Sequence, residues 1–248
     1  MAQIDVENLS LFYPLTGGAD KKIAPSTRPD ELVLVGRRKY IQALRDVSFS
    51  VSKGQKVGLV GRNGSGKSTL LRVLGGIYSP TSGRVLTQGK ISSLYGMNLG
   101  IQPDATGREN IVLRGIIKGW SRRELEARVP EIIDFSELGE FIDLPLRTYS
   151  DGMRMRLLFA AATAFSPEIL LLDEWIGAGD ARFQRKAAER MNSLVDQAGI
   201  TVIASHNRQL LRNVCELGIW LDRGVMRAFG PIADVYTQMD AHFAQTDK

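Results

Sequence analysis

Cysteine and histidine are scarce in this sequence. One cysteine, Cys215, occurs among 248 residues, so a disulfide within the chain is excluded. Because Cys215 lies in an apolar segment, we expect a small core residue in a reducing compartment rather than a nucleophile. Of the two histidines, His242 falls in a polar C-terminal stretch and is assigned no chemistry.

Long apolar runs and blocks of one charge are also missing. No run approaches the roughly 18 residues that a membrane span needs, and the N-terminus lacks a signal-peptide pattern, so we expect a cytosolic chain. The formal charge is +5, and no basic block predicts a nucleic-acid partner. The densest basic stretches, 21–22 and 37–39, favour a solvated loop face, with contact to an anionic membrane surface as the alternative. A hydrophobic content of 44% suffices for one large α/β domain, 1–248, with a subdomain.

A glycine-rich stretch at residues 61–69 fits the phosphate-binding pattern G-x-x-x-x-G-K-[ST]. An apolar run of strand type precedes it at 56–60, and helical spacing follows it, which is the context that a P-loop requires. Backbone N–H groups and the helix N-terminus favour a triphosphate there, and we expect Lys67 at the terminal phosphates and the Ser68 hydroxyl on Mg²⁺. The predicted nucleotide-binding residues of this stretch are Gly61, Arg62, Asn63, Gly64, Ser65, Gly66, Lys67, Ser68 and Thr69.

Two buried-strand patterns end in polar side chains. The run 169–172 leads into Asp173 and Glu174, and the run 201–205 leads into His206. Ligands bind at the carboxyl ends of strands in parallel sheets, so these side chains should lie beside the P-loop. We expect Asp173 to hold Mg²⁺ and Glu174 to polarise the attacking water, with His206 as a second catalytic residue.

The remaining patterns predict an α/β architecture with added parts. Alternating segments at 4–11 and 43–51 indicate a small antiparallel sheet, and turn residues at 14–40 indicate an inserted loop with at most one helical turn. Residues from about 97 to 165 carry helical signals, including a capping box at Ser121 and Glu124. Tyr13, after the first strand, can stack on a purine ring, and Tyr40 is the competing candidate.

Five motifs in order resemble the ATP-binding subunits of ABC transporters across essentially the whole chain. They are the aromatic Tyr13, the P-loop, the segment 149–153, the strand end at Asp173 and Glu174, and His206. The resemblance implies the fold of ABC-type P-loop NTPases, with a mostly parallel core sheet, an antiparallel β subdomain and an inserted helical subdomain. It also implies a partner permease that spans the membrane.

The segment 149–153 stands where the family has Leu-Ser-Gly-Gly-Gln, and only Ser150 and Gly152 match. Ser150 should cap the following helix, leaving N–H groups free for a γ-phosphate. In the family this helix serves the facing subunit's nucleotide, which implies a head-to-tail homodimer, with Asp180 in the loop that crosses the interface. The glutamine of the family's Mg²⁺-sensing loop has no counterpart, because Gln102 is several residues late.

The segments 103–110, 149–153 and 177–180 and the 14–40 insertion look like the branch that exports O-antigen or teichoic acid chains. We therefore expect an ATPase that drives lipid-linked polysaccharide export from the cytoplasmic face of the bacterial inner membrane. A transporter for another cargo, such as a lipid, drug or solute, is one alternative. A soluble ABC-type ATPase of repair, translation or cluster assembly is another, and a P-loop kinase or GTPase is a third.

Overall fold

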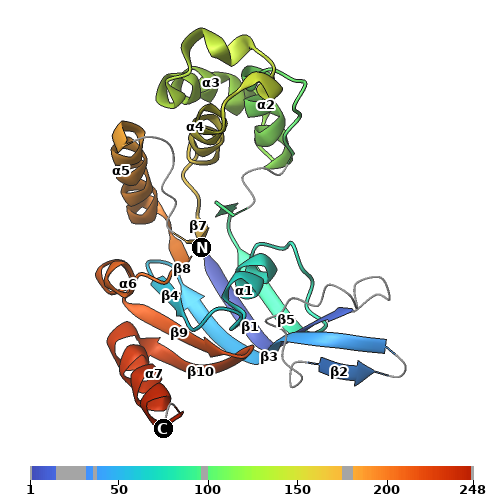
Figure 1. Cartoon of the computed structure of the whole chain (residues 1–248), viewed down its shortest axis with the longest axis vertical. Coiled ribbons are helices and arrows are strands. Elements are labelled where there is room, and N and C mark those ends of the chain that lie inside the picture. Colours follow the sequence, from blue (N-terminus) through green and yellow to red (C-terminus); the bar gives the residue numbers. More distant parts are fainter. Residues whose placement is uncertain (1, 15–31, 36–37, 96–99, 175–180, 247–248) are drawn as a thin grey trace. The chain divides into compact units, whose positions relative to one another are not determined.

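A computed structural model describes residues 2–14, 32–35, 38–95, 100–174 and 181–246 (Figure 1). The chain divides into two compact units. The sheet unit comprises Met1–Ser92, Glu168–Glu174 and Gly199–Lys248, and the helical unit comprises Ser93–Pro167 and Trp175–Ala198.

Parallel strands form the centre of the sheet unit, in the spatial order β9-β4-β8-β7. The residues of β8 are all buried, and so are the first four of β7, because these strands are apolar on both faces. Asp173 pairs in register with Ala204, so the ends of β7 and β8 meet at one edge, as predicted. The strand bounds are β4 Lys56–Val60, β7 Ile169–Asp173, β8 Ile200–Ala204 and β9 Leu217–Asp222.

The predicted antiparallel sheet is present and continues this core. Strand β1 lies between β3 and β5 and pairs antiparallel with both. Strand β10 pairs antiparallel with β9 and joins β3 through the parallel pair Val225 and Arg45. The bounds are β1 Gln3–Pro14, β3 Arg38–Ser52, β5 Ser82–Gln88, β6 Ile91–Ser93 and β10 Val225–Pro231.

The prediction of a loop over residues 14–40 is wrong in part. Strand β2, Leu32–Val35, pairs antiparallel with the start of β3, and β1 continues to Pro14. Leu-Val-Leu-Val is a strand-forming run, and the register that pairs Leu32 with Ile41 gives it a partner. Residues 15–31 lie outside the described residues.

The described part of the sheet unit includes the helices α1 Lys67–Leu74, α6 Arg208–Val214 and α7 Ile232–Thr246. Figure 1 shows α7 beside β9 and β10, and α6 contacts α7. Ile232 of α7 packs closely on the core strands, since a Cβ added to Gly58 would lie 2.8 Å from its Cδ1 atom. Glycine at position 58 therefore lets α7 approach the strand that leads into the P-loop.

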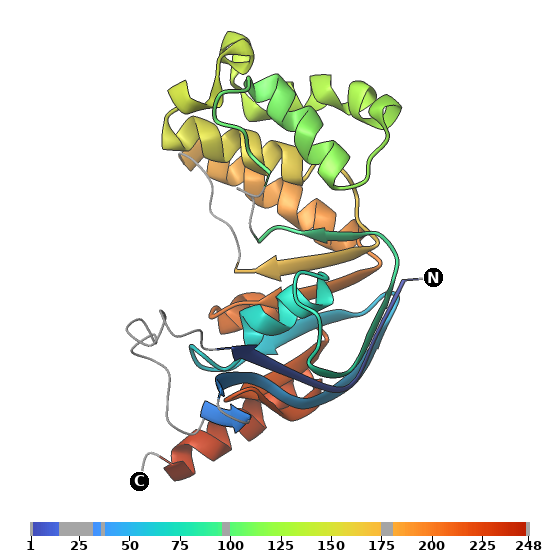
Figure 2. The ribbon, with the colours of Figure 1, turned by 90° about the vertical axis from the view of Figure 1, so that its right-hand side faces the viewer.

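The helical unit contains α2 Gly107–Ile117, α3 Arg122–Ser136, α4 Asp151–Ala162 and α5 Ala181–Gln197, with 3-10 turns at Gly139–Asp143 and Leu146–Thr148. The capping box of Ser121 and Glu124 is confirmed, and Thr106 and Glu109 form a second one. Helix α5 lies next to α4 in Figure 2, and Phe183 packs edge-on against Phe159. No helix within the described ranges combines the length and apolar composition of a membrane span.

Candidate nucleotide-binding site

The P-loop has the predicted strand, loop and helix order, between β4 and α1. Gly64 and Gly66 have φ angles of +79° and +104°, which L side chains rarely adopt. A Cβ at Gly66 would also meet the Ala43 carbonyl oxygen at 3.0 Å. The two glycines thus allow a sharply folded loop that begins a helix without a side-chain cap, leaving the first N–H groups of α1 available to a ligand.

The Lys67 side chain is held by the backbone of the P-loop. Its Nζ donates to the carbonyl oxygens of Gly61, at 2.8 Å, and Arg62, at 3.2 Å. Burial lowers the pKa of Lys67, while the nearby carboxylates of Glu174 and Asp173 act to raise it. A desolvated ammonium that donates to neutral carbonyls is suited to an exchange of partners with a phosphate.

Ser68 and Asp173 link the P-loop helix to the core sheet. The Ser68 hydroxyl donates to Asp173 Oδ1 at 3.0 Å. A hydroxyl and a carboxylate oxygen in contact are the hard oxygen donors that Mg²⁺ prefers. Ser65 lines the same cavity with a buried Oγ that has no hydrogen-bond partner among the described residues, so the cavity offers a further polar atom. The residues therefore fit a Mg²⁺-bound phosphate.

Glu174 and His206 come together at the ends of β7 and β8. His206 Nε2 lies 3.7 Å from Glu174 Oε1, and both side chains are about half exposed, at 55% and 52%. Glu174 has a φ of +70°, and its other carboxylate oxygen accepts from Ser205 Oγ at 3.1 Å. Ser205 is buried and accepts from the Asn207 backbone N–H, so it fixes the carboxylate. This arrangement leaves Glu174 oriented and open to water.

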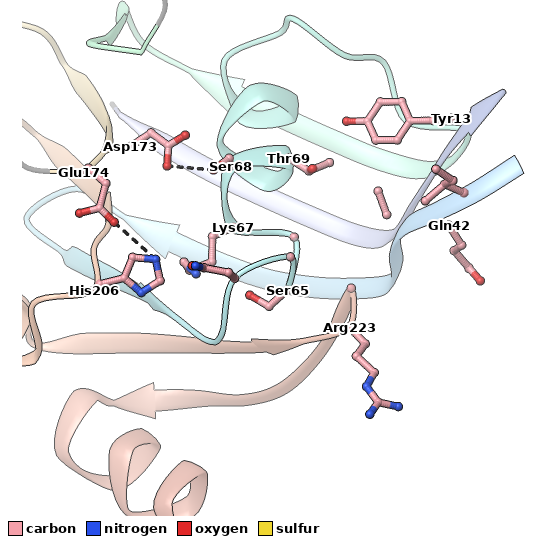
Figure 3. Close-up of a pocket in the computed structure, with 16 residues that line it drawn as sticks. Tyr13, Gln42, Ser65, Lys67, Ser68, Thr69, Asp173, Glu174, His206 and Arg223 are labelled. Atoms are coloured by element: carbon pink, nitrogen blue, oxygen red, sulfur yellow. Dashed lines mark hydrogen bonds and ion pairs between the residues drawn. The ribbon is translucent and has the colours of Figure 1, made fainter. Parts of the chain in front are cut away.

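These groups line one open cavity of about 690 Å³ (Figure 3). Asp173, Glu174 and His206 lie at one end, and Tyr13 lies at the other, beyond Thr69. Tyr13 packs edge-on against Tyr78, with ring centroids 5.4 Å apart. Burial raises the pKa of the Tyr13 hydroxyl, and a hydrogen bond with Thr69 acts in the opposite direction.

The cavity brings together most of the predicted residues of the sheet unit. Seven P-loop residues, Asn63 to Thr69, line it together with Tyr13, Asp173, Glu174 and His206. Gly61 and Arg62 instead line a neighbouring cavity of about 350 Å³. Tyr40 pairs with Val33 and Pro14 and does not line the nucleotide cavity as the structure describes it.

Sequence reasoning missed several residues that line or support the cavity. The turn between β9 and β10 contributes Arg223 and Gly224, and Gly224 donates to the Ser65 carbonyl at 3.0 Å. A Cβ at Gly224 would lie 2.6 Å from the Ala43 carbonyl oxygen. Asp-Arg-Gly at 222–224 is a turn sequence that by itself predicts only a hairpin, and the contact of this turn with the P-loop arises in the tertiary structure. The missed lining residues are Ile41, Gln42, Ala43, Arg223 and Gly224.

In the helical unit, Ser150 is the N-cap of α4 and accepts from the Met153 N–H at 3.2 Å, which confirms the predicted cap. Ser150 and Gly152 line a separate cavity of about 630 Å³. Gly152 is open, since among the described residues an added Cβ would meet only Ser150 Oγ, at 3.9 Å. Asp180 lies outside the described residues. Gln102 donates its backbone N–H to Asn110 Oδ1 at 2.9 Å, so its backbone braces α2.

A family model described as ABC transporter matches residues 44–177, from the middle of β3 past Glu174. The chain belongs to the ABC transporter family. The ABC resemblance of the sequence is thereby confirmed. The match covers the P-loop, Ser150 and Asp173, while Tyr13 and His206 lie beyond it.

Relatives of this ABC protein carry export names. The O-antigen export system ATP-binding protein RfbB of Myxococcus xanthus is 48% identical over 79% of this chain and 45% of its own length. The chain thus corresponds to about half of that relative. The O-antigen export system ATP-binding protein RfbE of Yersinia enterocolitica is 38% identical over 91% of this chain and 97% of its own. The resemblance to the polysaccharide-exporting branch is confirmed by these similarities.

A solved structure described as the ATP binding subunit of an ABC transporter has the same fold. Its TM-score is 0.71 at 22% identity, and the alignment covers 99% of each chain. At this identity the likeness concerns the fold alone. The predicted fold class of the ABC protein, a P-loop NTPase of ABC ATPase type, is confirmed.

Proposed function

We propose that this protein is the ATP-hydrolysing subunit of an ABC transporter that exports lipid-linked polysaccharide. The observation that carries the proposal is the cavity in which Lys67, the Ser68–Asp173 pair and Glu174 converge at one end, with Tyr13 at the other. A positive group, a hydroxyl–carboxylate pair and an aromatic ring in one cavity suit the phosphates, the metal and the base of Mg²⁺-ATP.

The P-loop residues and Lys67 bind the phosphates in this proposal. Lys67 leaves the carbonyl oxygens of Gly61 and Arg62, at 2.8 and 3.2 Å, and donates to the terminal phosphates. Ser68 and Asp173 would hold Mg²⁺, which would neutralise phosphate charge when bound. Tyr13 stacks on the base, and Tyr78, packed against it, limits the ring's freedom.

Glu174 acts on the water that attacks the terminal phosphate. Its carboxylate orients the water and draws on its proton, and the Ser205 hydrogen bond of 3.1 Å keeps the carboxylate in place. His206, 3.7 Å from the same carboxylate and at the same end of the cavity, contacts the terminal phosphate. Both residues come from strand ends that are in register, so the two groups keep their separation.

A second copy of the chain completes the site in this proposal. Ser150 begins α4, whose first N–H groups and dipole favour an anion. We infer that this helix end serves the γ-phosphate of the facing copy in a head-to-tail homodimer, with Asp180 at the interface. The open surface at Gly152 leaves room for that approach.

The transport role rests on the relatives. Two of them are named O-antigen export system ATP-binding proteins, and one of these spans nearly the same length as this chain. By this similarity we propose lipid-linked polysaccharide as the cargo and an integral membrane permease as the partner. The chain then works at the cytoplasmic face of the inner membrane, held there by the permease.

The test has two stages. The purified protein should hydrolyse Mg²⁺-ATP, and Lys67→Ala should remove nucleotide binding. Cells in which the chain and its membrane partner carry out export should then accumulate lipid-linked polysaccharide on the cytoplasmic side when Lys67→Ala replaces the wild type. Hydrolysis without this accumulation would refute the cargo and favour another transported solute or a soluble ATPase.

A further inference from the structure

The guanidinium of Arg62 rests on an aromatic ring of the C-terminal helix. Arg62 is the second residue of the P-loop, and its Cζ atom lies 5.2 Å from the centroid of the Phe243 ring in α7. The residues are 181 positions apart in sequence, and no sequence pattern links them. A cation over a ring face is an attractive contact, and the ring also restricts the rotamers of the arginine.

We propose that Phe243 is a positioning residue for the nucleotide site, because it fixes Arg62 and thereby the start of the P-loop. The inference rests on the proposed function, since it concerns how the same site is held ready for ATP. The backbone of Arg62 is part of that site: its carbonyl oxygen and that of Gly61 accept from Lys67 Nζ.

Helix α7 is itself a fixed support. Tyr236 and Met239 are buried, and Arg208 forms a two-point ion pair with Asp240, at 2.6 and 2.9 Å. The Arg208 guanidinium also covers the Tyr236 ring, 4.9 Å from its centroid. A helix attached at several points along its length can hold a ring in a constant position, whereas a frayed terminus could not.

A second path leads from Phe243 to the same place. Its ring packs edge-on against Trp220, with centroids 6.1 Å apart. Trp220 lies in register beside Val60, the last residue before Gly61. Gly61 in turn touches the Leu221 carbonyl so closely that an added Cβ would clash with it. Phe243 therefore contacts the P-loop side chain directly and the preceding strand through one intermediate.

His206 lies between the cavity beside Phe243 and the nucleotide cavity. It lines the nucleotide cavity and also the cavity of about 350 Å³ that Arg62, Tyr236 and Phe243 line. A displacement of the Arg62 side chain would therefore alter a space that His206 borders, in addition to the carbonyls that hold Lys67. Phe243 is placed to affect ATP binding first, because Lys67 contacts the phosphates.

The test compares ring-keeping and ring-losing variants in the full chain. Phe243→Leu removes the ring and keeps apolar volume, and we expect the KM for ATP to rise roughly two- to five-fold, with kcat unchanged. Phe243→Tyr should behave as the wild type. Gln238→Ala, on the exposed side of the same helix, is the matched control and should leave both constants unchanged.

A double-mutant cycle separates positioning from general stability. If Phe243 acts through Arg62, adding Phe243→Leu to Arg62→Met should raise KM no further than Arg62→Met alone. Additive effects, an unchanged KM in Phe243→Leu, or equal shifts in the Leu and Tyr variants would overturn the inference. None of these would affect the proposed function, which instead fails if the wild type neither binds nor hydrolyses Mg²⁺-ATP.

Discussion

The Ser68 hydroxyl lies 3.0 Å from Asp173 Oδ1, across 105 positions of sequence. One residue is in the first turn of α1, and the other ends β7. The hydrogen bond shows that the P-loop helix and the carboxylate strand reach the same edge of the sheet. It also places two oxygen ligands of one proposed Mg²⁺ site in contact.

Ser68→Ala removes a proposed metal ligand without touching the P-loop backbone. We expect the affinity for ATP to fall about ten-fold or more in Mg²⁺, since a ligand to a charged centre is lost. In excess chelator, wild type and variant should bind ATP equally. Ser68→Thr, which keeps the hydroxyl, should restore the Mg²⁺ effect, and a failure to do so would exclude the hydroxyl as the cause.

Glu174→Gln should keep ATP binding and nearly abolish turnover, because an amide cannot draw a proton from the attacking water. The variant should accumulate as an ATP-bound dimer, detectable by size-exclusion chromatography. Ser205→Ala should lower turnover only in part, since it removes the 3.1 Å hydrogen bond and leaves the carboxylate. Wild-type turnover in Glu174→Gln would remove this residue from the mechanism.

Ser150→Arg should act on the facing copy rather than on its own nucleotide. The bulky side chain fills the start of α4, while the P-loop in the sheet unit stays intact, so each monomer should bind ATP normally. ATP-dependent dimerisation and hydrolysis should be lost. Ser150→Ala, which removes only the cap, should cost about 1 kcal/mol of stability. An undisturbed dimer in the arginine variant would contradict the role of residues 149–153.

Tyr13→Ala should weaken ATP and GTP binding alike, by about ten-fold, because stacking contributes about 1–3 kcal/mol and reads no base. Tyr13→Phe should be nearly neutral, since the ring makes the contact. Tyr40→Ala serves as the control, because Tyr40 lies outside the lining of this cavity. Normal ATP binding in Tyr13→Ala together with weak ATP binding in Tyr40→Ala would show that the contact with the base comes from Tyr40, on the other side of the insertion.

Cys215 should make the stability of the fold depend on pH in the alkaline range. Burial raises the pKa of its thiol from 9.0 to about 12, so the folded chain keeps a proton that the unfolded chain releases. The thiol's contribution to the free energy of unfolding is complete below pH 9 and is lost as pH rises towards 12. The free energies of unfolding of wild type and Cys215→Ala, measured with denaturant, should therefore differ by a constant amount below pH 9. Above pH 9 the free energy of unfolding of the wild type should fall relative to that of the variant. A pH-independent difference would contradict the shift.

Local patterns in the sequence determined the elements that carry chemistry. The P-loop, the polar ends of β7 and β8 and the caps at Ser121 and Ser150 depend on neighbours within a few residues, so spacing alone predicts them. The family and the fold followed from the order of such motifs, and both were confirmed.

Contacts between distant segments were decided only in the tertiary structure. Pairing with β3 makes Leu32–Val35 a strand, and packing with α4 places α5 in the helical unit. Gly224 contacts Ser65 of the P-loop, and Phe243 contacts Arg62. Periodicity in the sequence cannot predict these contacts, because it does not show which strands pair. A short stretch of sequence encodes local conformation and burial preference. Which strand pairs with which depends on how the whole chain folds.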